Sequence, residues 1–165
     1  MTVNISKPTI NIREKLSELD FAKVPFQKMP SGSILQVVSA TDTTQRTTTS
    51  TSYVTGGNTL SVAITPSSTS SKIYVIVRHY AYNNLTAGLY TIYRDATNLA
   101  GGTNYLANYD SDAGTTDGTI VYFFLDSPNT TSSITYQPYM KASSGTTRMG
   151  TTASIASITA WEIAG

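Results

Sequence analysis

From Ser33 onward, apolar residues recur with the period of two that is typical of β-strands. In the segment NTLSVAIT, Leu60, Val62 and Ile64 alternate with small or polar residues, which predicts a half-buried strand. The longest segment of this kind reads KIYVIVRHYAY. The expected strands are Ser33–Ala40, Thr47–Thr55, Asn58–Thr65, Lys72–Tyr82, Leu89–Arg94, Thr119–Asp126, Ser133–Lys141 and Ser154–Ile163.

Clusters of glycine, proline, serine and asparagine separate these segments, as expected for turns. The pair Gly56-Gly57 stands between two of the expected strands and predicts a hairpin there. No helical pattern interrupts the series. About eight strands with this punctuation predict an all-β fold, an antiparallel β-sandwich that is jelly-roll-like.

One segment, TDTTQRTTTSTSYVT (41–55), consists almost entirely of small hydroxyl-bearing residues. Threonine is β-branched and favours pleated, solvent-facing positions. Because the segment lies between two apolar strands, we interpret 41–46 as an entry loop and 47–55 as a strand with a hydroxyl-rich face. A disordered linker is not predicted.

The start of the chain differs from the rest in its high content of charged residues. Residues 1–28 hold eight of the 21 charged side chains. Asn11 and Glu14 have the spacing of a capping box, and apolar residues follow at helical intervals, so one short helix is expected. A helix of about three turns is too short to be stable alone in water. Its apolar stripe should therefore pack on its own domain or on another chain.

These patterns divide the chain into an N-terminal anchoring arm, 1–30, and a β-sandwich head domain, 31–165. Two prolines close the arm and favour extended backbone after the helix. The arm residues expected to bind a partner are Ile12, Leu16, Leu19, Phe21 and Phe26.

Composition narrows the classes of partner. With 165 residues, 13% charged residues and a net charge of +1, the chain suits one neutral domain with no field that attracts nucleic acid or an anionic membrane. There is no cysteine, and the longest apolar runs have five residues, too few to span a bilayer. The first 15 residues lack the apolar core of a secretory signal, so synthesis in a cytoplasm is expected.

The sequence gives little support for a catalytic site. His79 is the only histidine and lies in a strand pattern, where a packing role is expected, and no G-x-S-x-G motif occurs. The segment Asn108–Gly118 holds Asp110, Asp112 and Asp117, which could serve as an acid pair or bind calcium. It lacks the spacing of a calcium loop, and aspartate favours turns in any case. We therefore predict no enzyme, no metal site and no cofactor.

Tyrosine is enriched, with eleven residues against four phenylalanines and one tryptophan. Such rings suit protein interfaces and sugar stacking, because they bury apolar area and still form a hydrogen bond. The alternative is that they cover the edges of a wide sheet. The residues predicted to contact a surface or a glycan are Tyr105, Tyr109, Asp110 and Asp112.

A family resemblance rests on several blocks, Gly32–Val38 (GSILQVV), Thr47–Thr55 and Leu60–Ile73 (LSVAITPSSTSSKI). Two further blocks are LYTIYRDATNLAGG and the final ITAWEIAG. Together they resemble the β-rich domain of tail-fibre-like and other virion structural proteins of tailed phages, especially marine and cyanobacterial ones. The resemblance covers roughly 31–165.

The resemblance implies a non-enzymatic β-sandwich module that is displayed on a virion and is often homotrimeric. It implies other virion proteins as partners, a location in the virion and synthesis in the host cytoplasm. The chain lacks the heptad shaft of a long fibre. A tail-fibre or appendage component is therefore weighed against a capsid decoration protein and against a module that binds a host cell-surface glycan. An envelope-degrading hydrolase is the least favoured alternative.

Overall fold

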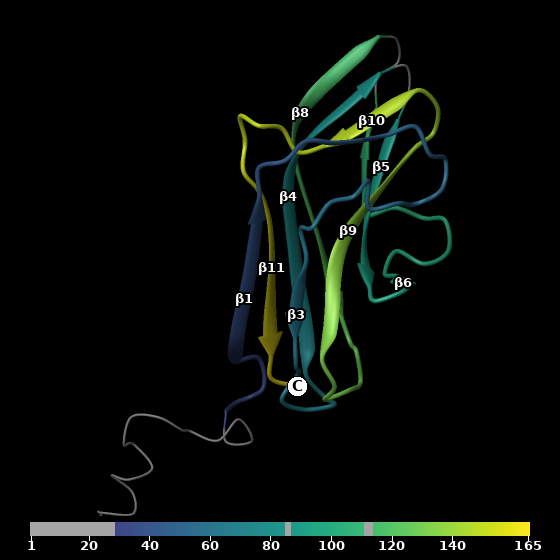
Figure 1. Ribbon diagram of the computed structural model, residues 1–165. Helices are drawn as coiled ribbons and strands as arrows, with labels where there is room; N and C mark the ends of the chain where they lie inside the picture. Colours follow the sequence, from purple (N-terminus) through teal and green to yellow (C-terminus); the bar gives the residue numbers. More distant parts are fainter. Residues whose placement is uncertain (1–28, 85–86, 111–113) are drawn as a thin grey trace, which may run out of the picture.

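The computed structural model describes residues 29–84, 87–110 and 114–165. These residues form two antiparallel sheets, which confirms the predicted all-β class (Figure 1). The strands are β1 (Ile34–Asp42), β2 (Arg46–Thr48), β3 (Val62–Ile64), β4 (Lys72–Asn84), β5 (Gly88–Arg94), β6 (Thr97–Asn98), β7 (Ala107–Tyr109), β8 (Thr115–Asp126), β9 (Ile134–Ala142), β10 (Thr146–Met149) and β11 (Ala156–Ile163).

Sheet A has the order β1-β11-β4-β10-β2, and β8 pairs with β4 on its other side. Sheet B has the order β3-β9-β5-β6, and β7 also pairs with β5. Of the longer strands, β1, β4, β8 and β11 lie in sheet A and β5 and β9 lie in sheet B.

The core lies between the two sheets and is built from the inward positions of each strand. In β4 the pattern is regular, with Ile73, Val75 and Val77 fully buried and the residues between them facing outward. The other buried apolar residues are Leu60, Val62, Ile64, Ala81, Tyr90, Ile92, Tyr122, Ile134, Tyr136, Met140, Met149, Ala156, Ile158 and Ala160. Their spacing follows the period of two that identified the strands.

All eight predicted strands have a counterpart, but the prediction for Thr47–Thr55 is wrong over most of its length. Strand β2 ends at Thr48, and only Val54 forms an isolated bridge, to Met140. The predicted hairpin at Gly56-Gly57 is wrong as well, because β2 pairs with β10 in sheet A while β3 pairs with β9 in sheet B. The segment between them crosses from one sheet to the other.

Hydroxyl side chains explain the early end of β2. The Thr48 hydroxyl accepts a hydrogen bond from the Ser50 amide at 3.0 Å, and the Ser50 hydroxyl accepts one from the Ser52 amide at 3.1 Å. The Ser50 hydroxyl also donates to the Ser52 carbonyl at 2.7 Å. Such local bonds satisfy the backbone in turns and compete with a sheet ladder.

The predicted arm helix, with Ile12, Leu16, Leu19, Phe21 and Phe26, lies outside the described residues. The first described residues, Met29 and Pro30, precede β1. The boundary at residue 30 between arm and head stays a prediction.

Candidate interaction surfaces

The outward face of sheet A carries apolar side chains across four neighbouring strands. The register aligns Leu125 of β8 with Tyr74 of β4, Tyr74 with Trp161 of β11, and Trp161 with Val37 of β1. The ring centroids of Tyr74 and Trp161 lie 6.1 Å apart, edge to face, and those of Tyr74 and Phe123 lie 5.6 Å apart. One row of side chains thus runs across the sheet without a charge.

We call this surface the apolar face and define it by eight residues: Ile34, Val37, Tyr74, Ile76, Val121, Phe123, Leu125 and Trp161. Its most exposed members stand on the two outermost strands, with Phe123 at 60%, Val121 at 58% and Val37 at 55% exposure. Single exposed apolar residues are ordinary on protein surfaces. A contiguous patch of aromatic and aliphatic groups marks an interaction surface.

Strand β8 shows how the sequence produces this face. Its run Val121–Leu125 is apolar at every position, so successive side chains point to opposite sides of the sheet with no polar side. Tyr122 is buried and Phe124 is half-buried against the core, while Val121, Phe123 and Leu125 point outward. A strand of this kind is expected to be covered on both faces. The described residues cover only one.

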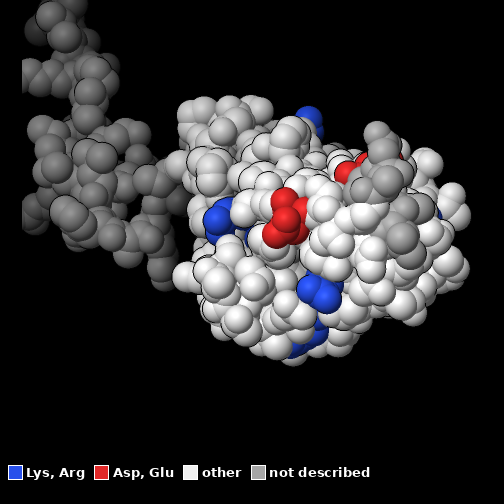
Figure 2. Space-filling model, turned by 90° about the horizontal axis from the view of Figure 1, so that it is seen from above, with Lys and Arg blue, Asp and Glu red and all other residues white. Residues whose placement is uncertain are grey.

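Charge is sparse around the apolar face. Lys72 and Arg78 stand at its margins on β4, and the Arg78 guanidinium donates a hydrogen bond to the Ile155 carbonyl at 2.8 Å. Figure 2, which views the molecule from above, shows a few charged groups among many neutral ones. Aromatic enrichment and few charges are typical of the buried centre of a protein–protein interface.

A second surface, on sheet B, holds a group that we call the tyrosine cluster: Tyr53, Tyr93 and Tyr139. The rings of Tyr93 and Tyr139 stack with centroids 3.9 Å apart, and Tyr53 meets Tyr93 edge to face at 6.1 Å. The Lys141 ammonium lies 4.5 Å from the centre of the Tyr53 ring. Partial burial and the neighbouring Tyr93 and Tyr105 raise the pKa of Tyr53 to about 12. Burial also raises the pKa of Tyr93, so the phenols of Tyr53 and Tyr93 are both neutral at physiological pH.

The loop before β7 covers this cluster. The Tyr53 hydroxyl donates to the Asn104 carbonyl at 2.8 Å, and the Lys141 ammonium donates to the Thr103 carbonyl at 3.0 Å. Tyr105, the next residue, is 49% exposed. An exposed ring beside a preformed aromatic group could stack on a sugar or on a partner's side chain.

The four predicted contact residues are not gathered in one place among the described residues. Tyr105 lies by the tyrosine cluster, whereas Tyr109 is half-buried, packs against the core and lies beside Gly118 of β8. Asp110 is exposed, and Asp112 lies outside the described residues. Only Tyr105 therefore combines exposure with aromatic neighbours.

His79 lies in the core and points away from both surfaces. Its Nδ1 lies 2.9 Å from the Tyr80 carbonyl, and its Nε2 lies 3.3 Å from the Tyr122 hydroxyl. Its ring contacts Tyr90, with centroids 4.8 Å apart. Burial lowers the pKa of His79 to about 4. A neutral imidazole enclosed by aromatic rings serves packing, as the sequence pattern indicated.

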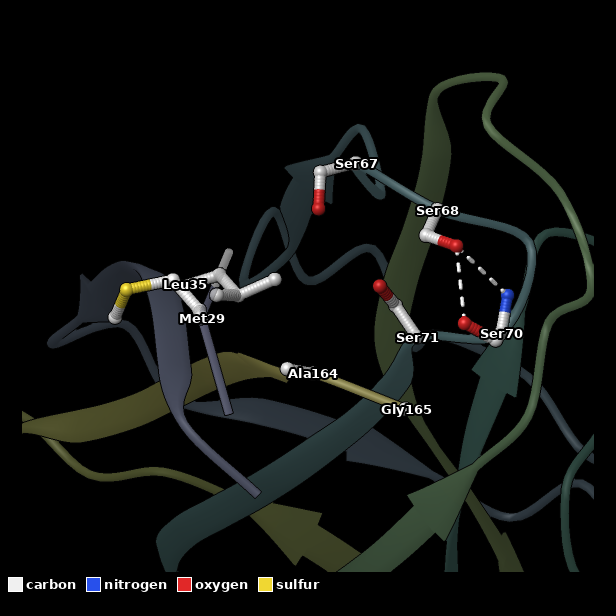
Figure 3. A pocket seen from close by; sticks show the side chains of 8 residues that line it. All are labelled: Met29, Leu35, Ser67, Ser68, Ser70, Ser71, Ala164 and Gly165. Carbon is white, nitrogen blue, oxygen red and sulfur yellow. Dashed lines mark hydrogen bonds between the residues drawn. The ribbon is translucent and has the colours of Figure 1, made fainter. Parts of the chain in front are cut away.

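A pocket of about 100 Å³ opens where β1 begins and β11 ends (Figure 3). It is lined by four serines, 67, 68, 70 and 71, together with Met29, Leu35, Ala164 and Gly165. Next to it, the buried Glu162 carboxylate accepts hydrogen bonds of 2.6 Å from the Ser67 amide, the Ser67 hydroxyl and Gln36. Substrate sites usually have several times this volume. The pocket has room for a few water molecules.

The described part of the chain contains neither a metal-binding cluster nor a membrane-spanning helix. No three histidine, aspartate or glutamate side chains gather there in an arrangement that could hold a metal ion. No helix there is long and apolar enough to cross a membrane.

Comparisons with known proteins give no family. No protein-family model matches the chain, and no curated protein matches it. The chain is similar to a solved viral particle of infectious bursal disease virus, with 14% sequence identity and a TM-score of 0.34, over 79% of this chain and 36% of that one. It is also similar to the VP2 subviral particle of that virus, with 16% identity and a TM-score of 0.31, over 79% and 37%.

Proposed function

We propose that this protein is a non-enzymatic structural component of a phage virion, of the tail-fibre or appendage type. In this proposal the N-terminal arm docks on other virion proteins and the β-sandwich head forms a homotrimer. The observation that carries the proposal is the apolar face of sheet A. The sequence blocks that resemble tailed-phage virion proteins supply the phage context.

The apolar face favours a role as a component of an assembly over a role as a free monomer. Phe123 and Val37 stand about 50–60% exposed on opposite edges of the same face, so the patch spans the whole width of four strands. Leaving such a patch in water costs roughly 25 cal/mol for each Å² of apolar surface. Contact with a neighbouring protein would remove that cost. The low charge of this face suits a crowded particle surface.

A charge placed within the apolar face tests this role. The variant Val37→Lys is expected to lower incorporation into virions at least tenfold, because an unpaired ammonium would be buried in the contact. The matched control is Thr41→Lys, since Thr41 is exposed on the same face of β1 but lies beyond the apolar row. Quantitative immunoblotting of purified particles measures both. Incorporation of Val37→Lys at the wild-type level would contradict the proposal.

A capsid decoration protein is the alternative location, and it uses the same face. The two locations differ in where the protein stands on the particle, so a density map of the virion separates them directly. Density on the tail supports the appendage, and density on the capsid lattice supports decoration.

The tyrosine cluster favours a second candidate function, binding of a host cell-surface glycan. Here the exposed Tyr105 ring would stack on a sugar, and purified protein would bind host envelope at micromolar concentration. We expect Tyr105→Ala to weaken binding about tenfold, which corresponds to loss of a stacking contact of roughly 1.4 kcal/mol. Tyr105→Phe keeps the ring and serves as the control. Absence of binding by the wild-type protein would remove this candidate.

A further inference from the structure

Strand β8 has an unprotected edge. Among the described strands it pairs with β4 alone, and the twelve-residue ladder between them contains no bulge. Its sequence, TTDGTIVYFFLD, has no lysine and no proline. Proteins usually blunt a sheet edge with such residues or with a bulge, because a long, flat, apolar edge pairs with other chains. From Thr119 to Leu125 nothing of this kind protects β8.

The same strand is self-complementary. Reading outward from Phe123 in either direction gives an aromatic residue, Tyr122 or Phe124, and then an aliphatic one, Val121 or Leu125. When two copies of such a strand pair antiparallel about Phe123, Val121 meets Leu125 of the other copy and Phe123 meets itself. Apolar and aromatic cross-strand pairs of this type stabilise a ladder by roughly 0.2–1 kcal/mol each.

We propose that residues 120–126 of β8 pair antiparallel with the same residues of a second copy of this chain, about a two-fold axis at Phe123. A two-fold axis perpendicular to the sheet keeps each side chain on its own face, so the exposed stripes of both copies merge. The two copies of sheet A become one continuous sheet in which β8 is central. Residues 115–118 stay outside the pairing, which leaves room for Tyr109 beside Gly118.

The size of the contact sets its strength. Seven residues of backbone and three apolar side chains for each copy bury less than the ~800 Å² that a standard interface buries on each partner. Free in solution, the pair should therefore be weak and concentration-dependent. The contact goes beyond the proposed function, and a particle that displays copies side by side would strengthen it by raising their effective concentration to about the millimolar range.

The absence of cysteine from the chain permits a direct test with single-cysteine variants. Directly opposite residues of an antiparallel pair have Cα atoms about 4.5 or 5.5 Å apart, and a disulfide spans about 4.4–6.8 Å. Phe123→Cys in the full chain is therefore expected to form a disulfide-linked dimer under mild oxidation by copper phenanthroline. In Val121→Cys the two sulfur-bearing positions stand roughly 13 Å apart along the strands and should not join. Mixing it with Leu125→Cys should yield the mixed dimer.

Val37→Cys is the control for disulfides that form when two copies collide at random. Val37 has nearly the same exposure as Phe123 and lies on the opposite edge of the apolar face. Dimer yield from Phe123→Cys no greater than from Val37→Cys would overturn the proposal. Sedimentation at rising concentration gives an independent readout, in which Phe123→Lys should lower the mass of the wild-type assembly and Thr41→Lys, which lies outside the apolar face, should leave it unchanged. Wild-type incorporation of Val37→Lys into virions together with intact β8 pairing would contradict only the proposed function, so the two proposals fail separately.

Discussion

Replacing Arg94 with methionine is expected to lower the free energy of unfolding by about 3 kcal/mol. The Arg94 Nη1 atom donates hydrogen bonds of 2.8 Å to both oxygens of Asp126, and the Tyr136 hydroxyl donates a third at 2.7 Å. Asp126 is only 5% exposed. Without Arg94 its carboxylate stays buried with one donor and no compensating charge, which is the costly half of a broken ion pair.

Loss of the Arg94–Asp126 pair is expected to destabilise the whole domain, because the pair connects its two sheets. Asp126 ends β8 in sheet A, whereas Arg94 ends β5 and Tyr136 lies in β9, both in sheet B. The three side chains therefore bridge the two layers of the sandwich. Burial and the hydrogen bond to Asp126 raise the pKa of Tyr136, so its hydroxyl keeps its proton and remains a donor.

Urea denaturation followed by circular dichroism measures the effect, and two variants control it. Arg78→Met removes an arginine whose guanidinium, among the described residues, bonds only a surface carbonyl, and it should cost less than about 1 kcal/mol. Adding Asp126→Leu to Arg94→Met should recover most of the lost stability, because an apolar pair of similar volume often replaces a buried ion pair at little cost. If Arg94→Met lowers the free energy of unfolding by less than about 0.5 kcal/mol, roughly the ordinary effect of a surface substitution, the buried Asp126 carboxylate does not depend on Arg94.

The strands of the core were predictable because burial on one face imposes a visible period. In β3, Val62 and Ile64 are buried and Ala63 between them is exposed, as the alternation indicated. The prediction failed at 47–55, where threonine and serine favour a strand by propensity. The same hydroxyls can satisfy the backbone locally, and the bonds at Ser50 do so. Propensity alone does not decide between these outcomes.

The interaction surfaces were less predictable, for a different reason. The run Val121–Leu125 marked a strand, but an unbroken apolar run does not say whether its second face is covered by the same chain. The Arg94–Asp126 pair spans 32 positions in sequence, and no local pattern indicates it. Tyr105 was identified from composition, whereas its neighbours Tyr53 and Tyr93 are brought to it by the crossing between sheets. Such groupings arise from tertiary pairing.

Acidification from pH 6.5 to pH 5 is expected to destabilise the protein through His79, by about 1 kcal/mol for each pH unit. Burial lowers the pKa of His79 to about 4, whereas an unfolded histidine titrates near 6.5. Between these values the unfolded chain binds a proton that the folded chain does not, so lowering the pH favours unfolding. Over the full interval down to pH 4 the loss approaches 3 kcal/mol.

The chain offers a clean test because His79 is its only histidine. Asp42 and Glu162 also have shifted pKa values, but hydrogen bonds hold both below the ordinary carboxylate range, so they act mainly below about pH 4.5. Urea midpoints at pH 6.5, 6 and 5 should fall for the wild-type chain and stay level for His79→Gln. The variant is expected to differ in stability at every pH, because Tyr122 loses its imidazole partner, so the slope with pH is the readout. Equal slopes of the urea midpoint with pH in both proteins would mean that another group binds the proton. His79 would then not remain neutral between Tyr90 and Tyr122.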